Sequence, residues 1–264
     1  MRIPRYLKET LRFLGAMSPF LLFALIYNSM RYYPNYLVND IDTEGVYNLE
    51  KQLFGIVADG VLLTPCEYFR LHHWAVADVL SGLFYLCWVP LPILYCIWLY
   101  AGRRRDLSFR LSCGFLFVNL IGFCGYYIYP ASPPWYVMDY GFIPVLDTPG
   151  NVAGFVNFDR IVGFPLFHTI YSGNANVFAA IPSMHAAYCP IALFYALKLK
   201  GNAVWIAILS VVSVGIWCSA VYSGHHYIID VILGILTVVV GLPLFEAIAG
   251  RRPFFNPNAW SWLD

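Results

Sequence analysis

Two stretches, Phe178-Ala-Ala-Ile-Pro-Ser-Met-His185 and Ser219-Ala-Val-Tyr-Ser-Gly-His-His-Tyr-Ile-Ile-Asp230, decide how the rest of this chain is read. Both place ionisable side chains inside otherwise apolar sequence. Such groups are costly in or near hydrocarbon, so in a membrane segment they indicate function by default. The apolar run between the two stretches is long enough for two spans and a tight turn. We therefore expect the stretches to meet at one face of a membrane and to form a single site there.

The composition is that of a membrane protein. Of the 264 residues, 60% are hydrophobic and 12% are charged, whereas about 25% of residues are charged in soluble domains. The net charge of +1 gives no indication of a nucleic acid or another polyanion as partner. We therefore expect an all-α membrane protein that forms a single domain over residues 1–264.

Six segments are long and apolar enough to be predicted as membrane-spanning helices. Their expected bounds are about 11–30, 74–100, 111–129, 184–199, 203–222 and 227–248. Pro90 and Pro92 predict a kink in the second helix. The first helix is expected to be retained, because no small-residue cleavage site follows it.

The distribution of cations predicts how these helices are oriented. With the N-terminus in the cytoplasm, most of the 16 Lys and Arg residues fall on the cytoplasmic side, as the positive-inside rule requires. Those expected on the outer side are Arg31, Lys51, Arg70 and Arg160. Six spans then put both termini in the cytoplasm and the site at the outer, periplasmic or lumenal, face. The compact loops favour a bacterial inner membrane, and Glu246 is expected to meet Arg251 or Arg252 at the inner surface.

The outer segments are expected to carry short interfacial helices. Val46 to Val57 has the apolar spacing of a helix that lies in the membrane interface, and Asp59-Gly60 predicts a turn. Thr64-Pro65-Cys66-Glu67 predicts a helix start with a capping box. The segment Tyr129-Pro-Ala-Ser-Pro-Pro-Trp-Tyr136 is expected to be a rigid, non-helical turn, because prolines fix φ and remove N–H donors.

Two histidines and one aspartate provide the chemistry. Asp230 follows His226 by four residues, so both side chains lie on one helix face. A carboxylate in that position can hold one ring nitrogen and leave the other with a free lone pair. His185 reaches the same face from the other stretch. One imidazole can then attack phosphorus while the other donates and accepts the proton; the alternative is that all three are polar residues of the core.

The residues Pro182-Ser-Met-His185 and His226-Tyr-Ile-Ile-Asp230 resemble the second and third signatures of the type 2 phosphatidic acid phosphatase superfamily. In that family the last His is the nucleophile, its Asp partner orients it and the earlier His is the general acid. The resemblance therefore implies the roles of nucleophile, orienting residue and general acid for His226, Asp230 and His185, respectively. The six-helix topology of the family is also similar to the one expected here.

This chain departs from the phosphatases of that family at two places. The Arg that follows the Ser of their last signature is Ala220 here, and their first signature, with its Lys and Arg-Pro pair, is replaced by Pro130-Ala-Ser-Pro-Pro-Trp-Tyr136. The motifs Pro-Pro-Trp-Tyr at 133–136, Phe-x-x-x-Pro-Ser-Met-His at 178–185 and His-His-Tyr-x-x-Asp at 225–230 resemble instead the inositol phosphorylceramide synthase branch. Enzymes of that branch move phosphoinositol from phosphatidylinositol to ceramide and release diacylglycerol. A phosphodiester has one negative charge and a monoester about two. A site without cationic side chains is therefore better suited to the diester.

We therefore predict a membrane lipid phosphotransferase of this branch, acting through a phosphohistidine on a phosphatidylinositol-like donor and a ceramide-like acceptor. The alternative is a lipid phosphate or pyrophosphate phosphatase of the same superfamily, and a non-catalytic lipid-binding or transport protein is a third possibility. We expect no metal and no cofactor, because the histidines lack metal-ligand spacing; the sequence leaves the oligomeric state open. Candidate substrate-binding residues, each of which also suits a structural role, are Ser183, His225, Trp135, Tyr136, Asp139 and Arg160.

Overall fold

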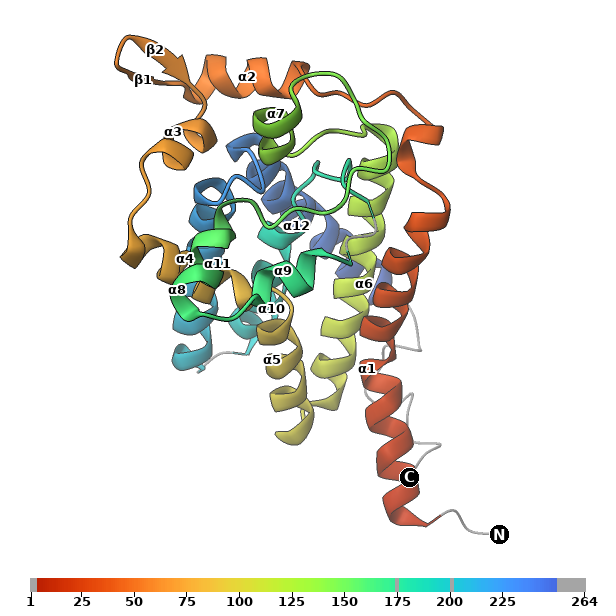
Figure 1. Cartoon of the computed structure of the whole chain (residues 1–264). Helices are drawn as coiled ribbons and strands as arrows, with labels where there is room; N and C mark the ends of the chain where they lie inside the picture. Colours follow the sequence, from red (N-terminus) through yellow and green to blue (C-terminus); the bar gives the residue numbers. More distant parts are fainter. Residues whose placement is uncertain (1–3, 174–175, 200–201, 251–264) are drawn as a thin grey trace.

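The structure, a computed structural model, describes residues 4–173, 176–199 and 202–250. Long helices form a bundle, and short helices and a β-hairpin gather toward one of its ends, in the upper part of Figure 1, with the helices of residues 153–171 lowest, in front of the bundle. We call this the loop end; it carries residues 30–74, 129–173, 176–184 and 223–227. The long helices are α1 (Arg5–Ser29), α6 (Arg105–Ile128), α11 (Ala203–Tyr222) and α12 (Ile228–Ala249).

Among the described residues, these four helices are long and apolar enough to cross a membrane. A fifth span is present if α4 (Ala75–Leu86) and α5 (Pro90–Ala101) count as one broken helix, since they are bent by 44°. This break confirms the kink predicted at Pro90, which takes the first position of α5, where a proline is well tolerated. The chain therefore has several apolar helices consistent with an integral membrane protein.

The expected span at 184–199 is helix α10 (His185–Lys198), which has 14 residues. At 1.5 Å per residue it is about 21 Å long, shorter than the roughly 30 Å hydrocarbon core. Six spans therefore stay a prediction. The other expected helices are present, but α1 and α6 each begin about one and a half turns earlier than predicted. The prediction counted only apolar residues and so left out the charged first turns of these helices. Arg, Lys and Glu are nevertheless good helix formers, so the helices begin there.

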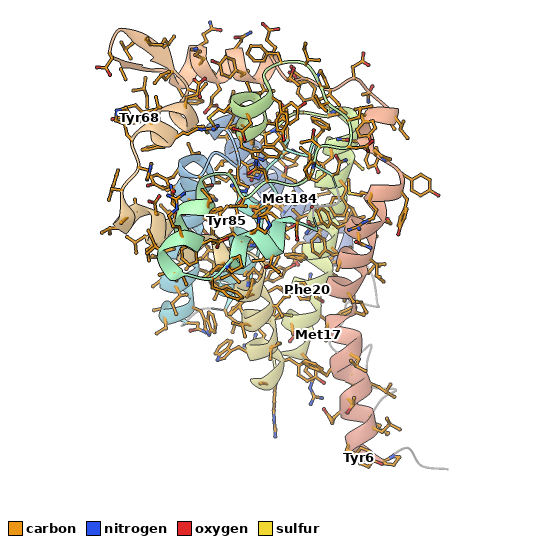
Figure 2. All side chains as sticks on the ribbon, viewed as in Figure 1. Tyr6, Met17, Phe20, Tyr68, Tyr85 and Met184 are labelled. Atoms are coloured by element: carbon orange, nitrogen blue, oxygen red, sulfur yellow. The ribbon has the colours of Figure 1, made fainter. Side chains whose placement is uncertain are left out.

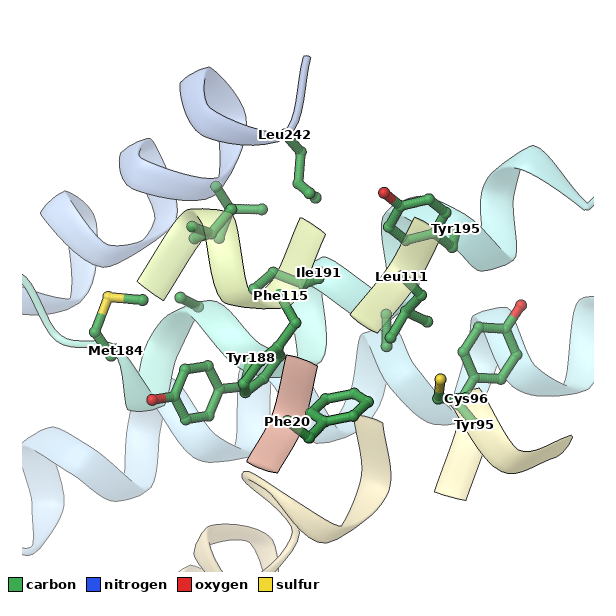
Figure 3. Packing of buried hydrophobic residues seen from close by; sticks show 14 of the residues in the cluster. Phe20, Tyr95, Cys96, Leu111, Phe115, Met184, Tyr188, Ile191, Tyr195 and Leu242 are labelled. Atoms are coloured by element: carbon green, nitrogen blue, oxygen red, sulfur yellow. The ribbon is translucent and has the colours of Figure 1, made fainter. Parts of the chain in front are cut away.

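Helix α10 lies in the centre of the bundle. Its small residues Ala186, Ala187, Ala192 and Ala196 have no exposed surface, so neighbouring helices approach it closely. In the buried cluster of Figure 3, Phe20 of α1, Phe115 of α6 and Tyr188 of α10 pack in series, with ring centroids 4.8 and 4.7 Å apart. A helix enclosed in this way is held by packing with its neighbours, and it fixes the position of His185 at its start.

The first outer segment folds as α2 (Gly45–Phe54), β1 (Ile56–Ala58), β2 (Val61–Leu63) and α3 (Pro65–Leu71), preceded by the 3₁₀ turns η1 (Met30–Tyr32) and η2 (Asn35–Leu37). The chain is mostly helical, as predicted, but it includes this short β-hairpin, because the helix expected to reach Val57 ends at Phe54. Asp59 and Gly60 have φ of 50° and 78°, the left-handed turn that closes a tight hairpin. The predicted turn is thus confirmed, as is the capping box between Thr64 and Glu67.

The second outer segment contains α7 (Pro134–Tyr140), η3 (Ala153–Phe155), α8 (Val156–Val162) and α9 (Leu166–Tyr171). The expectation of a non-helical turn was wrong for Pro134–Tyr136, because Pro134 takes the first position of α7. A proline there has a suitable φ and needs no N–H partner.

In Figure 2 the buried side chains of Tyr85 and Met184 lie in the upper half of the bundle, far from Tyr6 near the start of α1.

Backbone hydrogen bonds tie the outer segments together. The amide of Asp42 donates to the carbonyl of Pro130 at 2.8 Å, and that of Ala131 donates to Phe178 at 3.0 Å. The buried Asn35 side chain donates to the carbonyls of Tyr126 and Phe178, both at 2.8 Å. The loop end is therefore one connected layer over the helices, and the stretch that leads to His185 is part of it.

Candidate active site

The two histidine stretches meet beneath this layer. His185 begins α10 and His226 lies between α11 and α12; Nδ1 of His185 is 2.9 Å from Nε2 of His226. The His185 ring is also held by aromatic neighbours, since Trp88 and Tyr85 lie 4.4 and 5.1 Å from it between ring centroids. The structure thus brings together the two imidazoles that the sequence predicted to share one site.

The loop that carries His226 reverses the chain tightly. The amides of His225 and His226 both donate to the carbonyl of Ala220, at 3.0 and 3.1 Å, so the pair folds back over the end of α11. Gly224 has a φ of +74°, a conformation open to glycine at little cost. Its carbonyl accepts from the amide of Trp135 at 2.9 Å. The outer segment therefore fixes the histidine loop from above.

Asp230 lies behind His226 in the first turn of α12. Its Oδ2 is 3.4 Å from Nδ1 of His226 and accepts from the amide of Tyr227 at 2.9 Å. Its Oδ1 has no hydrogen-bond partner, and the side chain has no exposed surface. The spacing of four residues thus gives the expected pairing, with Nδ1 of His226 toward the carboxylate and Nε2 toward His185.

Glu50 of α2 holds the start of α12 from outside. Its carboxylate accepts from the amides of Ile228 at 2.9 Å and Ile229 at 3.2 Å, so it occupies two of the donors that a helix N-terminus leaves free. Burial raises the pKa of Glu50 to about 7, against the lowering effect of these two hydrogen bonds. Sequence reasoning missed this residue, because its partners are 178 and 179 positions away and nothing local marks them.

Helix α12 also packs directly on the segment that leads to His185. The amide of Ser183 donates to the backbone carbonyl of Asp230 at 2.9 Å. A Cβ at Gly234 would lie 2.1 Å from the carbonyl oxygen of Ser183, so only glycine permits this approach. Ser183 itself is buried, and its hydroxyl accepts from the amide of Ala186 at 3.4 Å. The two halves of the site are therefore held in register by backbone contacts.

A cavity of about 350 Å³ opens onto the histidines. His185, His225 and His226 border it, and none of its described lining residues is Lys or Arg. Aromatic side chains line much of the rest: Phe23, Tyr27, Trp88, Phe123, Tyr126 and Tyr188. A volume of this size suits part of a lipid, and the aromatic lining suits its apolar portion.

A second, more polar pocket of about 390 Å³ lies on the other side of Trp135 and Asn151, which border both spaces. Its lining includes Arg70 and Asp139, which form an ion pair at 2.7 Å. It also includes His73, Asp78 and Asn157. Amide, carboxylate and imidazole groups of this kind can bind hydroxyl groups.

Burial sets the charge state of the histidine loop. It lowers the pKa of His226 to about 3 and holds the pKa of His225 well below its usual range. Both rings are then neutral near pH 7 and keep one nitrogen with a lone pair. A neutral His226 is in the form required of a nucleophile.

The predicted binding residues are placed unequally. His225 borders the histidine cavity, and Trp135 separates it from the polar pocket. The hydroxyl of Tyr136 is used by the loop, since it donates to the carbonyl of Ile143 at 3.0 Å and accepts from the amide of Val145. Arg160 is exposed on α8 and borders neither space. Their roles in binding remain predictions.

Sequence reasoning missed two tyrosines beside the histidines. Tyr85 of α4 and Tyr171 of α9 have buried hydroxyls without a hydrogen-bond partner, and so does Nε2 of His225. A buried polar group left unpaired costs about 1–3 kcal/mol. With 20 tyrosines in the chain, nothing in the sequence singles these two out.

Two histidine rings in contact, with a buried carboxylate behind one of them at the end of an apolar bundle, suit a class of membrane enzymes: those that transfer or hydrolyse phosphoryl groups of lipids. The sequence profile of the PAP2 superfamily matches residues 62–244. The chain therefore belongs to this superfamily, which confirms the resemblance seen in its signatures.

Curated relatives narrow the class further. The chain is 57% identical over 245 residues to a phosphoinositol dihydroceramide synthase of Bacteroides thetaiotaomicron, covering 91% of this chain and 80% of that protein. It is 28% identical over 173 residues to the inositol phosphorylceramide synthase of Candida albicans, covering 61% of this chain and 35% of that one. The identity is 26% over 238 residues to the catalytic subunit AUR1 of Saccharomyces cerevisiae, covering 88% of this chain and 56% of that one.

These relatives confirm the prediction of a lipid phosphotransferase similar to inositol phosphorylceramide synthases. The chain spans most of the Bacteroides protein but only about a third to just over half of the fungal ones. No solved structure matches it significantly.

Proposed function

We propose that this protein transfers a phosphoinositol headgroup from phosphatidylinositol to a ceramide-type acceptor, with diacylglycerol as the other product. One observation carries the proposal: Nε2 of His226 lies 2.9 Å from His185, with Asp230 behind its other nitrogen. The relatives named as phosphoinositol dihydroceramide and inositol phosphorylceramide synthases support the choice of lipids.

The reaction proceeds in two steps through a phosphohistidine. In the first, Nε2 of His226 attacks phosphorus and the bond to the glycerol oxygen breaks. His185, as the imidazolium that the anionic diester favours, gives one proton to that oxygen and is left neutral, and diacylglycerol leaves. In the second, His185 takes the proton of the acceptor hydroxyl as its oxygen attacks phosphorus, and the phosphorus–nitrogen bond breaks. Asp230 keeps the Nδ1 proton of His226 in place, so that the lone pair lies on Nε2.

The two spaces around the histidines suit the two ends of the donor. The aromatic cavity of about 350 Å³ would take the glycerol and the first acyl carbons. The polar pocket beyond Trp135 would take the inositol hydroxyls, with Asp139, Asn151 and Arg70 as partners. The absence of Lys and Arg from the described lining of the cavity favours a phosphodiester, which carries a single charge.

The decisive experiment gives the purified protein phosphatidylinositol labelled in its headgroup, with and without ceramide. We expect a labelled ceramide product and an equal amount of diacylglycerol only when ceramide is present. Release of inorganic phosphate from phosphatidic acid without headgroup transfer would instead favour a lipid phosphatase. No turnover of either lipid would contradict both.

For the membrane arrangement we propose six spans, with α10 as the short fourth, the site at the outer face and both termini in the cytoplasm. Arg104, Arg110 and Lys198 support this, because they lie at or near helix ends opposite the loop end. Val57→Cys at the exposed hairpin should react with a membrane-impermeant maleimide in intact cells, whereas Arg104→Cys should not. The opposite pattern, measured above the labelling of the unmodified protein, would reverse the orientation.

A further inference from the structure

Three polar atoms beside the catalytic histidines have no partner among the described residues. They are the hydroxyls of Tyr85 and Tyr171 and Nε2 of His225, and all three are buried. They come from α4, α9 and the histidine loop, so three separate elements deliver them to one place. Protein interiors rarely leave such groups unpaired. Their convergence beside a reactive centre therefore points to a ligand.

The rings that carry these atoms are fixed by one another. Tyr171 lies 4.5 Å from His225 between ring centroids, and both border the histidine cavity. Phe155 packs on His225 at 4.9 Å. Tyr85 is fully buried behind them, 5.7 Å from His225 and 5.1 Å from His185. The aromatic packing leaves little freedom to the polar atoms, so a ligand would meet them already in position.

The contact made by Nδ1 of His225 determines which nitrogen of the ring carries the proton. Nδ1 lies 3.0 Å from the hydroxyl of Ser223, which has the carbonyl of Ala220 as its other acceptor at the longer distance of 3.3 Å. When that hydroxyl donates to Nδ1, a neutral ring carries its proton on Nε2. His225 then offers one N–H, and Tyr171 offers one O–H.

We infer that Tyr171 and His225 form a neutral clamp that binds the two non-bridging oxygens of the transferred phosphodiester, with Tyr85 as the positioning residue behind Tyr171. The inference rests on the proposed function, because it takes the phosphorus to be attacked by His226. The two phenols lie near one another but make no hydrogen bond in this structure; once a ligand takes the Tyr171 proton, the Tyr85 hydroxyl can donate to the Tyr171 oxygen. Tyr171 then directs its own proton into the cavity.

The clamp would decide which substrates react. A phosphodiester has two non-bridging oxygens and one charge, which two neutral donors can satisfy. A monoester has three such oxygens and about two charges, so at least one oxygen and one charge would stay unpaired in a site whose described lining holds no Lys or Arg. We therefore expect the protein to prefer diesters because of these donors.

Tyr171→Phe and Tyr85→Phe each remove one hydroxyl and little volume. The matched control is Tyr95→Phe in α5, because the Tyr95 hydroxyl is also buried and unpartnered but packs against Trp98 and Trp205, away from the site. We expect Tyr171→Phe to lower kcat/KM for transfer by about 10²-fold, in the range for loss of one oxyanion donor. Tyr85→Phe should cause a smaller loss, and Tyr95→Phe none. Equal activity of all three variants would overturn the clamp.

A double variant tests the role of Tyr85. If Tyr85 acts through Tyr171, its substitution should have no further effect once the Tyr171 hydroxyl is absent. Losses that multiply in Tyr85→Phe/Tyr171→Phe would mean that Tyr85 acts independently, against the inference. Because each variant removes a buried hydroxyl without a partner, its unfolding midpoint should stay the same or rise. A loss of activity without a fall in the midpoint then indicates a role in binding and not in folding.

Orthovanadate separates this inference from the proposed function, because it is a phosphate analogue without an inositol or lipid group. We expect it to raise the unfolding midpoint of the purified wild-type protein, and to do so much less in Tyr171→Phe. If the wild type binds vanadate through Tyr171 but does not transfer phosphoinositol, the proposed substrates are wrong and the clamp is supported. Transfer by the wild type with unchanged kcat/KM and vanadate binding in Tyr171→Phe would refute the clamp alone. Neither transfer nor vanadate binding by the wild type would refute both.

Discussion

The two ends of the bundle each hold a carboxylate, in contrasting environments. Away from the loop end, Glu246 of α12 accepts from Arg110 at 2.9 Å, from the hydroxyl of Tyr195 at 2.8 Å and from Lys198. At the loop end, Asp230 of the same helix has no cation partner among the described residues. Its Oδ1 is unpaired, and its Oδ2 accepts from a backbone amide and lies 3.4 Å from Nδ1 of His226, which makes no hydrogen bond.

The different surroundings of the two carboxylates indicate that Glu246 stabilises the fold, whereas Asp230 serves the reaction. Glu246 is surrounded by donors and ties three helices together, as a partly buried charge must if it is to stabilise a fold. Asp230 is fully buried without such compensation, a situation that proteins tolerate where a group must act on a neighbour. The same contrast holds for Tyr195, whose hydroxyl makes two hydrogen bonds, and Tyr85, whose hydroxyl makes none.

The largest effect is expected from His226→Ala. It removes the nucleophile and should lower transfer by about 10⁴-fold or more, as loss of a catalytic group that acts within a unit does. The acid-labile phosphoenzyme formed from phosphatidylinositol labelled with ³²P should disappear as well. His72→Ala is the control, because His72 is exposed on the loop end and borders neither space. A fully active His226→Ala protein would exclude the phosphohistidine.

Replacing each of the two carboxylates by an amide tests the contrast between Asp230 and Glu246 directly. Asp230→Asn should lower kcat by about 10²–10⁴-fold, because the amide no longer favours the Nδ1 proton of His226. Glu246→Gln should leave kcat near its original value and lower the free energy of unfolding by about 1–2 kcal/mol, because it weakens contacts to Arg110 and Lys198. Activity and thermal unfolding are measured on both proteins. If both variants lost the same property, the contrast between the two ends would not hold.

Ala220→Arg restores the arginine of the superfamily's phosphatases and should shift the activity of this protein from transfer toward hydrolysis of monoesters. Ala220 is fully buried in the same apolar cluster as Tyr85 and Phe155, so Arg must displace neighbours, and we expect transfer to fall. The charge should raise hydrolysis of phosphatidic acid relative to transfer by a few-fold, because a dianionic monoester gains more from a cation. Ala220→Met adds bulk without charge and should leave the ratio unchanged. The same ratio in both variants would remove the argument from charge.

The sequence predicted the parts of the site that depend on local spacing. Asp230 faces His226 because four residues make about one helical turn, and His185 meets them because two apolar runs return the chain to one end. Glu246 was assigned to Arg251 or Arg252, which lie outside the described residues. Within the described part of the chain its partners are Arg110 and Lys198, which are distant in sequence but lie on neighbouring helices.

The remaining parts depend on tertiary contacts that leave no local signal. Glu50 looked like one polar residue on an amphipathic helix, and only the fold brings it to the amides of Ile228 and Ile229. Tyr171 lies on a short helix of the second outer segment that no sequence pattern predicted. The apolar composition of residues 184–199 likewise could not show that α10 is enclosed by other helices. Motif spacing thus located the reactive groups, whereas the groups that hold them could be found only in the folded protein.

The smallest effect concerns Glu50 and is a dependence on pH. Burial raises its pKa from 4.5 to about 7, so the folded protein keeps a proton that the unfolded chain releases in this range. The stability contributed by the neutral carboxyl is complete below pH about 4.5 and is lost as the pH rises through about 7, by at most about 3 kcal/mol. Glu50→Gln cannot titrate, so the difference in unfolding midpoint, wild type minus variant, should fall between about pH 5 and about pH 7.5.

Subtracting the midpoint of the variant removes the contribution of His226, which is the same in both proteins. That contribution has the opposite sign, because burial lowers the pKa of His226 and stability is then lost as the pH falls. Glu44→Gln, at the exposed start of the same helix, should show no such trend. A constant difference across this range would mean that Glu50 does not change its protonation there. The residue would then hold the start of α12 as a permanent anion, and the helix that carries Asp230 would be fixed equally at every pH in the range.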